Sequence, residues 1–335
     1  MKKCCFIIPY FGKLPKSFAV FLKSCSYNTE FNWLVFTDDH CSFDYPDNFI
    51  VKYTTLKEIS ELAEKKLGFH VSLDQSYKLC DFKPAYGFLF EEYLQGYQFW
   101  GHCDIDTIMG NLSKLLTDEL LNQYDKLFCM GHMILYRNTF ENNRVFMSLY
   151  NGRLLYKDVF TTPSICWFDE EWNGHNNINQ IFLSKGKKVL QEDWSANFNV
   201  YVQKFERDIF GVDEKTKTIQ HCCEKKHGAL YIWDNGNACR YFIEKDHLER
   251  EDFLYMHFQW RKMSFKKEIL IADRFKIVPN AFLKIDKLPT TIQEFKRIKK
   301  WKLCFYKVNL YYQMHILRRI KKLINTLISL NRNKR

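Results

Sequence analysis

Two aspartates stand two places apart in the stretch FWGHCDIDTIMGNL, residues 99–112. Side chains alternate between the two faces of a strand, so Asp104 and Asp106 are expected on the same side of the chain. Two crowded carboxylates repel each other, and one takes up a proton unless a positive charge stands nearby. A divalent cation removes this conflict, and oxygen ligands suit Mg²⁺ or Mn²⁺ better than zinc. The pair therefore predicts a metal site, with a solvated turn as the alternative.

The elements that position this pair follow an alternating order. Short apolar runs at 4–10 and 33–39 are typical of buried parallel strands, and the amphipathic stretches 16–28 and 56–68 of helices packed on them. This order predicts a parallel sheet flanked by helices, with ligands beyond the carboxyl ends of its strands. The run 96–103 adds a strand that leads into the paired aspartates.

Further elements are expected along the rest of the chain. They are a helix over 83–94, strands at 126–130 and 132–137, helices over 138–150 and 176–185, and a hairpin at 229–244. The sequence thus predicts an α/β protein whose middle third is irregular and surrounds the site.

The composition fits a compact enzyme or binding domain. With 335 residues, 46% hydrophobic and 17% aromatic, the chain can bury a full core. Its 12 cysteines are scattered without a repeated CxxC, which is typical of reduced thiols in a cytosolic protein. The apolar run after Lys3 ends at Pro9, too early for a signal peptide, and no stretch is long enough to span a bilayer. We therefore expect the body of the protein in the cytoplasm.

The run LCDFKPAYGFLFEEYLQGYQFWGHCDIDTIMGNL, residues 79–112, resembles the DXD-containing glycosyltransferases of GT-A fold. It is especially similar to bacterial capsule and lipopolysaccharide sugar transferases, in which an acidic and a basic residue head a helix, an aromatic strand follows, and D-x-D ends it. The resemblance implies a GT-A-like, mostly parallel α/β sheet. It also implies a hexosyltransferase that uses a nucleotide-diphosphate sugar, with UDP-sugar expected, and Mn²⁺ or Mg²⁺.

The resemblance implies roles for residues in two stretches. Asp106 would bind the metal directly, and Asp104 would bind the metal or the ribose hydroxyls. His257, in YMHFQWRKM, would complete the metal shell, although a lone His on an aromatic strand is otherwise typical of a core. Lys262 would contact the diphosphate. Together with Arg261 and Lys83 it would form a cationic clamp.

Four further residues and one aromatic ring complete the implied donor site. Asp81 and Lys83 would contact the donor, with Lys83 neutralising a phosphate; the alternative is a helix-capping Asp beside a surface Lys. At the ends of the first two strands, Tyr10 would stack on the base, and Asp38 and Asp39 would hydrogen bond to the nucleotide. Read alone, these three could be ordinary loop residues.

Adjacent acids lie between aromatic residues in CWFDEEWNGHNN, residues 166–177. Aromatic rings stack on sugars, while a carboxylate binds hydroxyls or accepts a proton, so this stretch suits an acceptor pocket. If the enzyme inverts configuration, Asp169 or Glu170 is the predicted base, with Asp193 as a weaker rival. The alternative is a solvated acidic loop.

The basic excess of the chain lies at its C-terminal end. Residues 294–335 hold 13 Lys and Arg against one acid, while the preceding residues hold 37 basic and 38 acidic side chains. Apolar residues recur there at helical spacing, so we divide the chain into a catalytic domain, 1–292, and a basic amphipathic helical tail, 293–335. Such a tail is typical of docking to an anionic membrane surface. A helix packed on the body and a nucleic-acid-binding arm are the alternatives.

The sequence thus favours a metal-dependent glycosyltransferase on the inner face of the cell membrane. It would take a nucleotide-sugar donor and a growing surface polysaccharide or lipid-linked glycan as acceptor, with no nucleic acid expected. The rivals are another metal-dependent phosphate enzyme, such as a nucleotidyltransferase, and a basic nucleic-acid-binding protein.

Overall fold

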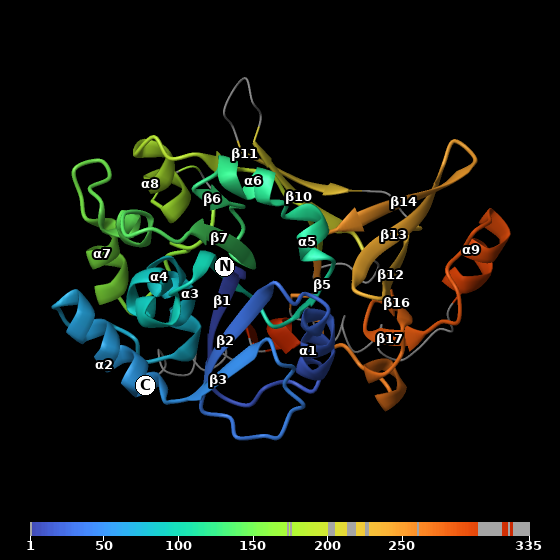
Figure 1. Ribbon diagram of the computed structural model, residues 1–335, viewed down its shortest axis with the longest axis horizontal. Coiled ribbons are helices and arrows are strands. Elements are labelled where there is room, and N and C mark those ends of the chain that lie inside the picture. The colour runs from blue at the N-terminus through green and yellow to red at the C-terminus, as the bar shows by residue number, and fades with distance from the viewer. Residues whose placement is uncertain are drawn as a thin grey trace.

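The computed structural model describes residues 2–172, 174, 176–199, 205–212, 219–224, 228–259, 261–300, 317–320, 322 and 323. Within them the strands form one seven-stranded and two five-stranded sheets. Most helices lie against the largest sheet, and one of the smaller sheets stands beside it together with the last labelled helix (Figure 1). The protein is therefore a mixed α/β structure.

The seven-stranded sheet contains the parallel strands that the sequence predicts. In spatial order its strands are β3 (Phe49–Tyr53), β2 (Phe31–Thr37), β1 (Lys2–Tyr10), β4 (Tyr97–Cys103), β7 (Met133–Arg137), β6 (Lys126–Leu127) and β8 (Val189–Leu190). The first four are mutually parallel, whereas β7 runs antiparallel to β4 and pairs with β6. Because β6 and β7 form a hairpin, the sheet is mixed beyond β4.

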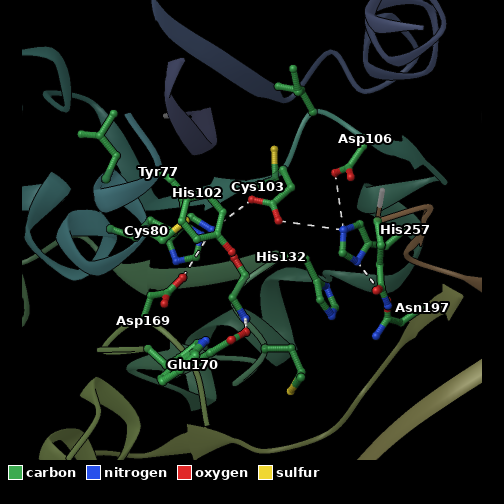
Figure 2. Close-up of a pocket in the computed structure, with 18 of the residues that line it drawn as sticks. Tyr77, Cys80, His102, Cys103, Asp106, His132, Asp169, Glu170, Asn197 and His257 are labelled. Atoms are coloured by element: carbon green, nitrogen blue, oxygen red, sulfur yellow. Dashed lines mark hydrogen bonds and ion pairs between the residues drawn. The ribbon is translucent and has the colours of Figure 1, made fainter. Parts of the chain in front are cut away.

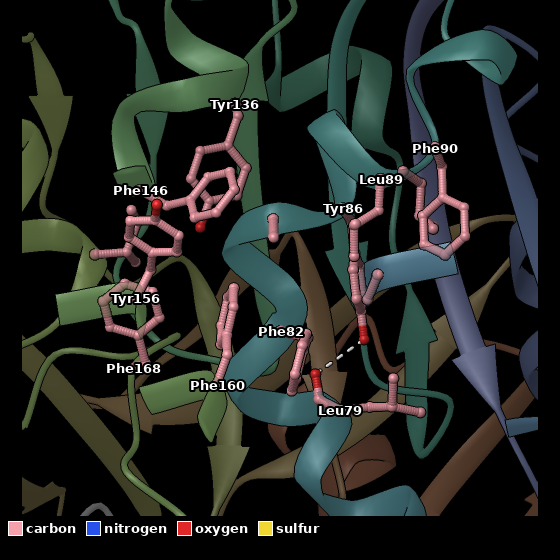
Figure 3. Packing of buried hydrophobic residues seen from close by; sticks show 14 of the residues in the cluster. Leu79, Phe82, Tyr86, Leu89, Phe90, Tyr136, Phe146, Tyr156, Phe160 and Phe168 are labelled. Carbon is pink, nitrogen blue, oxygen red and sulfur yellow. Dashed lines mark hydrogen bonds between the residues drawn. The ribbon is translucent and has the colours of Figure 1, made fainter. Parts of the chain in front are cut away.

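Helices cover both faces of this sheet. They are α1 (Phe18–Ser26), α2 (Leu56–Leu67), η1 (Ser76–Lys78), α3 (Leu79–Phe82), η2 (Lys83–Ala85), α4 (Tyr86–Leu89), η3 (Glu91–Tyr93), α5 (Leu112–Leu115), α6 (Asp118–Gln123), η4 (Asn142–Met147), α7 (Leu155–Thr161) and α8 (Ile178–Ser184). Alternation along β1 separates two cores: Phe6 packs in the cluster that contains Phe18, and Ile7 in the one that contains Phe82 and Tyr86. Figure 3 shows the aromatic side chains of the second cluster.

The helix predicted over 83–94 is broken into short turns, because this segment lies directly against the sheet. A Cβ atom on Gly87 would stand 2.2 Å from the Trp100 indole, so only glycine allows this approach. By contrast, α2 is a continuous amphipathic helix. It begins with a capping box between Thr55 and Glu58 and ends at Gly68, whose φ is 79°.

The first five-stranded sheet joins segments that are far apart in the chain. Its strands are β11 (Ile219–Glu224), β10 (Arg207–Val212), β9 (Ser195–Phe198), β15 (Tyr255–His257) and β5 (Thr107–Met109). β15 lies between β9 and β5, and it pairs parallel with β9 and antiparallel with β5. This sheet therefore brings the predicted late histidine beside the strand that follows the paired aspartates.

The second five-stranded sheet is antiparallel and includes the predicted hairpin. Its strands are β14 (His247–Phe253), β13 (Asn237–Glu244), β12 (Leu230–Asp234), β16 (Arg274–Val278) and β17 (Ala281–Lys284), with η5 (Lys267–Leu270) nearby in the chain. The predicted hairpin is confirmed as β12 and β13, which pair directly. The other three strands were not predicted.

The predicted tail begins inside this part of the fold. α9 (Ile292–Lys299) places Phe295 in a core cluster with Leu230 and Ile232, where Phe295 is only 3% exposed. This residue therefore packs on the body and does not face a membrane. The apolar positions expected between 301 and 316 lie outside the described residues. Among the described helices, none has the length and apolar character needed to cross a bilayer.

Candidate metal centre

Strand pairing brings the two aspartates and His257 together. β4 ends at Cys103, and the chain turns through the aspartates into β5, with the Thr107 hydroxyl donating to the Asp104 carbonyl oxygen at 2.7 Å. In the β5–β15 ladder His257 lies opposite Thr107, and the backbone N–H of Phe258 donates to the Asp106 carbonyl oxygen at 3.0 Å. The register of this ladder therefore fixes the imidazole against the turn.

The side chains of Asp104, Asp106 and His257 converge on one point, and Figure 2 shows Asp106 and His257 facing each other. One potential ligand atom of each lies within 4.8 Å of the others. His257 Nε2 stands 3.4 Å from an Asp106 carboxylate oxygen and 3.9 Å from one of Asp104. Two carboxylates and one imidazole form a donor set that suits a divalent cation, because hard oxygen ligands are combined with a nitrogen ligand of intermediate softness. The predicted Asp104, Asp106 and His257 thus form a candidate metal site.

Asn197 orients the imidazole for this role. Its side-chain oxygen lies 2.9 Å from His257 Nδ1 and also accepts from the Gln259 amide at 3.0 Å. An amide oxygen only accepts, so Nδ1 carries a hydrogen and Nε2 is the nitrogen that faces the carboxylates. Burial alone would lower the pKa of His257, but the charges of Asp106 and Asp104 outweigh it and raise that pKa above 6.5. Binding of a metal would therefore displace a proton from this ring.

Lys83 connects the metal site to a second carboxylate. Its ammonium lies 3.0 Å from Asp104 Oδ1, 3.3 Å from Asp169 Oδ2 and 2.7 Å from the Gly131 carbonyl oxygen. An ammonium has three N–H donors, and these three acceptors match that number. Burial opposes the charge, but both carboxylates hold the pKa of Lys83 well above its usual range. Lys83 therefore holds the carboxylates together, and its predicted contact with a donor phosphate stays a prediction.

Asp169 and Glu170 meet at the other side of this lysine. Burial raises the pKa of Asp169 to about 7, with Lys83 opposing and Glu170 adding to the shift, and the residue is only 4% exposed. Glu170 accepts from the Gly131 backbone N–H at 3.2 Å and from the Trp172 indole at 2.5 Å. A Cβ atom on Gly131 would lie 2.7 Å from Asp169 Oδ2, so glycine is needed where the chain passes these carboxylates.

All of these groups line a single cavity of about 1010 Å³. Its volume is at the upper end of the range for small-molecule sites, about 300–1,000 Å³. Of the residues predicted for the site, the lining includes Tyr10, Lys83, Asp104, Asp106, Asp169, Glu170, Asp193, His257, Arg261 and Lys262. Arg318, from the described part of the tail, also lines it. Figure 2 shows Asp169 and Glu170 on one side of the cavity and His257 with Asn197 on the other.

Burial contradicts the predicted donor contact of Asp81, and the protein itself engages the two other predicted carboxylates, Asp38 and Asp39. Asp81 is 0% exposed and is paired with Lys78 at 2.8 Å, so it does not face the cavity. Asp38 accepts from the Gly12 backbone N–H at 2.7 Å, and Asp39 from that of Leu14 at 2.8 Å. Neither is among the described residues that line the cavity. Asp38 and Asp39 therefore fix loops near the site, and their predicted contacts with the nucleotide stay predictions.

Two other predicted groups are also engaged by the protein. The Arg261 guanidinium donates to the Asn199 and Pro279 carbonyl oxygens, at 2.5 and 3.3 Å, and burial lowers its pKa to about 10. Asp193 accepts from the Ser195 backbone N–H at 2.9 Å and that of Phe210 at 3.2 Å. Lys262, by contrast, is exposed at the cavity.

Sequence reasoning missed three groups that shape the site, Asn197, Gly131 and His132. His132 is buried, with Nδ1 2.5 Å from the Tyr255 hydroxyl and its ring 4.6 Å from that of His257. Burial, together with His257 and Lys83, lowers the pKa of His132 well below 6.5, so it stays neutral beside the metal ligand. The only sign of these groups in the sequence was Gly131, which lies between the expected strands 126–130 and 132–137.

Comparison with known proteins identifies the family. A family model described as "Family of unknown function (DUF6625)" matches residues 6–286. The chain belongs to this family. The residues matched to the DUF6625 model include both sides of the cavity described above, whereas the predicted tail lies beyond them.

Other comparisons add little to this assignment. No protein in the curated set matches the sequence. In structure, this DUF6625 member is similar to mouse xyloside xylosyltransferase 1 in its apo form, with a TM-score of 0.32 and 8% identity. The match covers 59% of this chain and 87% of that chain. A likeness at this score establishes neither a shared fold nor a shared activity.

Proposed function

We propose that the protein is a metal-dependent glycosyltransferase. It would move a hexose-type sugar from a nucleotide-diphosphate donor, UDP-sugar in the first instance, to a growing bacterial surface polysaccharide or lipid-linked glycan. The observation that carries this proposal is one cavity with two kinds of site. Asp104, Asp106 and His257 converge on one side, and the carboxyl groups of Asp169 and Glu170 stand on the other.

The first site suits the donor. Asp104, Asp106 and His257 would hold Mn²⁺ or Mg²⁺, which when bound supplies positive charge to offset the charge on a departing diphosphate. Asn197 keeps the His257 ring in the ligating orientation. The exposed Lys262 offers a further cation to the phosphates, and Tyr10, which also lines the cavity, offers a ring to the base.

The second site suits activation of an acceptor hydroxyl. A general base works best when its pKa lies near the operating pH, and burial raises the pKa of Asp169 to about 7. In an inverting reaction, Asp169 takes the proton of the hydroxyl while that oxygen attacks the anomeric carbon. The bond from this carbon to the diphosphate breaks with its electron pair on the leaving phosphate. Glu170, hydrogen bonded beside it, is the alternative base.

Donor binding tests the proposal directly. Purified protein is mixed with Mn²⁺ or Mg²⁺ and a panel of nucleotide sugars, and thermal protection and slow donor hydrolysis are measured. We expect one donor to protect the protein, and Asp106→Ala to lose this protection while keeping its own melting temperature. Asp74→Ala, at an exposed carboxylate, serves as the matched control. Failure of every nucleotide sugar to bind with any cation would reject the proposal.

We further propose that the tail attaches the protein to the inner face of the cell membrane. Residues 301–335 contain nine Lys and Arg and no acid, and each basic residue near an anionic leaflet contributes about 1 kcal/mol. Because Phe295 belongs to the core, the test deletes only 301–335 and keeps α9. We expect this deletion to release the protein from phosphatidylglycerol vesicles, with phosphatidylcholine vesicles as control. Equal binding by both forms would contradict attachment through the tail.

A further inference from the structure

Three large aromatic side chains are exposed at the cavity that holds Asp169 and Glu170. Tyr77 and Trp167 are each 58% exposed and Trp172 is 50% exposed, and all three line the cavity. A single exposed ring is ordinary, but three at one cavity form a concentrated apolar surface. We call Tyr77, Trp167 and Trp172 the aromatic rim.

The backbone beneath Trp167 is fixed by a buried ion pair. Asp81 accepts hydrogen bonds from the backbone N–H groups on either side of Trp167, from Cys166 at 2.9 Å and Phe168 at 3.1 Å. The same carboxylate pairs with Lys78, and both side chains are 0% exposed. A buried, fully bonded pair therefore sets the position of this loop.

The loop holds Trp167 in an unfavourable backbone conformation. Its φ is 52°, in the left-handed region that bulky residues rarely adopt. Such conformations persist only where the surroundings impose them, and they concentrate at functional sites. Trp167, whose backbone is strained, is also one of the most exposed large side chains. The surrounding contacts therefore stabilise an unfavourable conformation that keeps this indole at the cavity rather than in the core.

Polar groups of Trp172 and Tyr77 lie near the carboxyl groups. The Trp172 indole donates to Glu170 at 2.5 Å. Burial raises the pKa of the Tyr77 hydroxyl, and Glu170, Asp104 and Asp169 add to the shift, which places the hydroxyl within their field. Figure 2 shows Tyr77 on the same side of the cavity as Asp169 and Glu170. Apolar ring faces thus stand next to hydrogen-bond acceptors.

We propose that the aromatic rim binds a sugar ring of the acceptor, with its C–H face against Trp167 and its hydroxyls toward Glu170 and Asp169. A pyranose combines an apolar face with a polar edge, and this pairing of exposed rings and carboxylates matches both. Tyr77 lies on the side of the cavity away from His257 and Asn197 (Figure 2), so we assign the ring bound at the rim to the acceptor and not to the donor's nucleotide. This inference rests on the proposed glycosyl transfer, because that reaction makes the bound sugar an acceptor. Sugar binding itself can be measured without the reaction.

The test measures sugar binding without metal or donor. Methyl glycosides of glucose, galactose, mannose and N-acetylglucosamine are titrated in EDTA, followed by tryptophan fluorescence and by calorimetry. We expect at least one to bind, and Trp167→Ala to weaken it by about tenfold or more, with Trp167→Phe recovering part of the loss. Phe140→Ala removes another exposed ring, outside the cavity lining, and should leave binding unchanged.

The outcomes separate this inference from the proposed function. Sugar binding that depends on Trp167, without turnover of any nucleotide sugar, supports the rim and rejects the transfer reaction. Donor hydrolysis without any sugar binding overturns the rim and leaves the transfer reaction standing. Binding of UDP alone that is weakened by Trp167→Ala also overturns the assignment, because it would place a nucleotide base on the rim.

Discussion

Replacing Asp169 by Asn should remove a large pH dependence of stability. The pKa of this carboxyl is about 7 in the folded protein, against an ordinary value of 3.8. A shift of about three units corresponds to about 4 kcal/mol, at about 1.36 kcal/mol per unit. Because the folded state holds the proton more tightly than the unfolded state, stability falls as pH rises from about 4 to about 7 and then levels off.

The measurement compares urea unfolding of wild type and Asp169→Asn in EDTA, at about pH 5 and about pH 8.5. About 3 kcal/mol of this pH dependence falls between these two pH values. As the pH rises from about 5 to about 8.5, the free energy of unfolding of wild type should therefore fall by about that much relative to the variant. Asn keeps the shape and still accepts from Lys83. Asp74→Asn, at an exposed carboxylate, should follow wild type. Parallel pH profiles for wild type and Asp169→Asn would refute the burial argument.

Three further predictions concern the metal site, the glycine beside Asp169 and the start of the tail. Asn197→Ala removes the acceptor from His257 Nδ1 and should lower Mn²⁺ affinity by about 10- to 100-fold in calorimetry, with unaltered affinity as the contrary result. Gly131→Ala forces a methyl group against Asp169 and should lower the free energy of unfolding, measured in urea, by about 1–3 kcal/mol. A variant as stable as wild type would show that the loop moves to accommodate the methyl group. Phe295→Ala should lower it by about 3–5 kcal/mol, and a loss under about 1 kcal/mol would show that α9 is not part of the core.

The sequence predicted the parts of the fold that have a local pattern. Buried runs separated by amphipathic stretches identify β1, β2 and the helices α1 and α2, because burial on both faces of a parallel strand leaves a continuous apolar segment. The paired aspartates were predicted because a strand end and a like-charged pair stand together in the chain. His257 entered only through the resemblance, and the β5–β15 register brings it there.

What the sequence could not give depends on contacts between distant segments. β5 and β15 are three residues each, too short for a periodic signal, so the ladder that assembles the site was not foreseen. Asn197 likewise has no local pattern. The resemblance assigned Asp81 to the donor, and the sequence of a helix N-terminus does not show which way a carboxylate faces. Lys78, three residues before it, was the available sign of a buried pair.

In the proposed transfer reaction, the sharing of one ammonium between Asp104 and Asp169 would give the cavity a means of ordering its substrates. While no cation is bound to Asp104, Lys83 divides its charge between two anions. A cation on Asp104 would leave that charge to Asp169, whose proton would then dissociate more easily. Coupling of this kind would keep Asp169 protonated, and the acceptor side inactive, until the donor side is filled. It would thereby protect an activated sugar from attack by water.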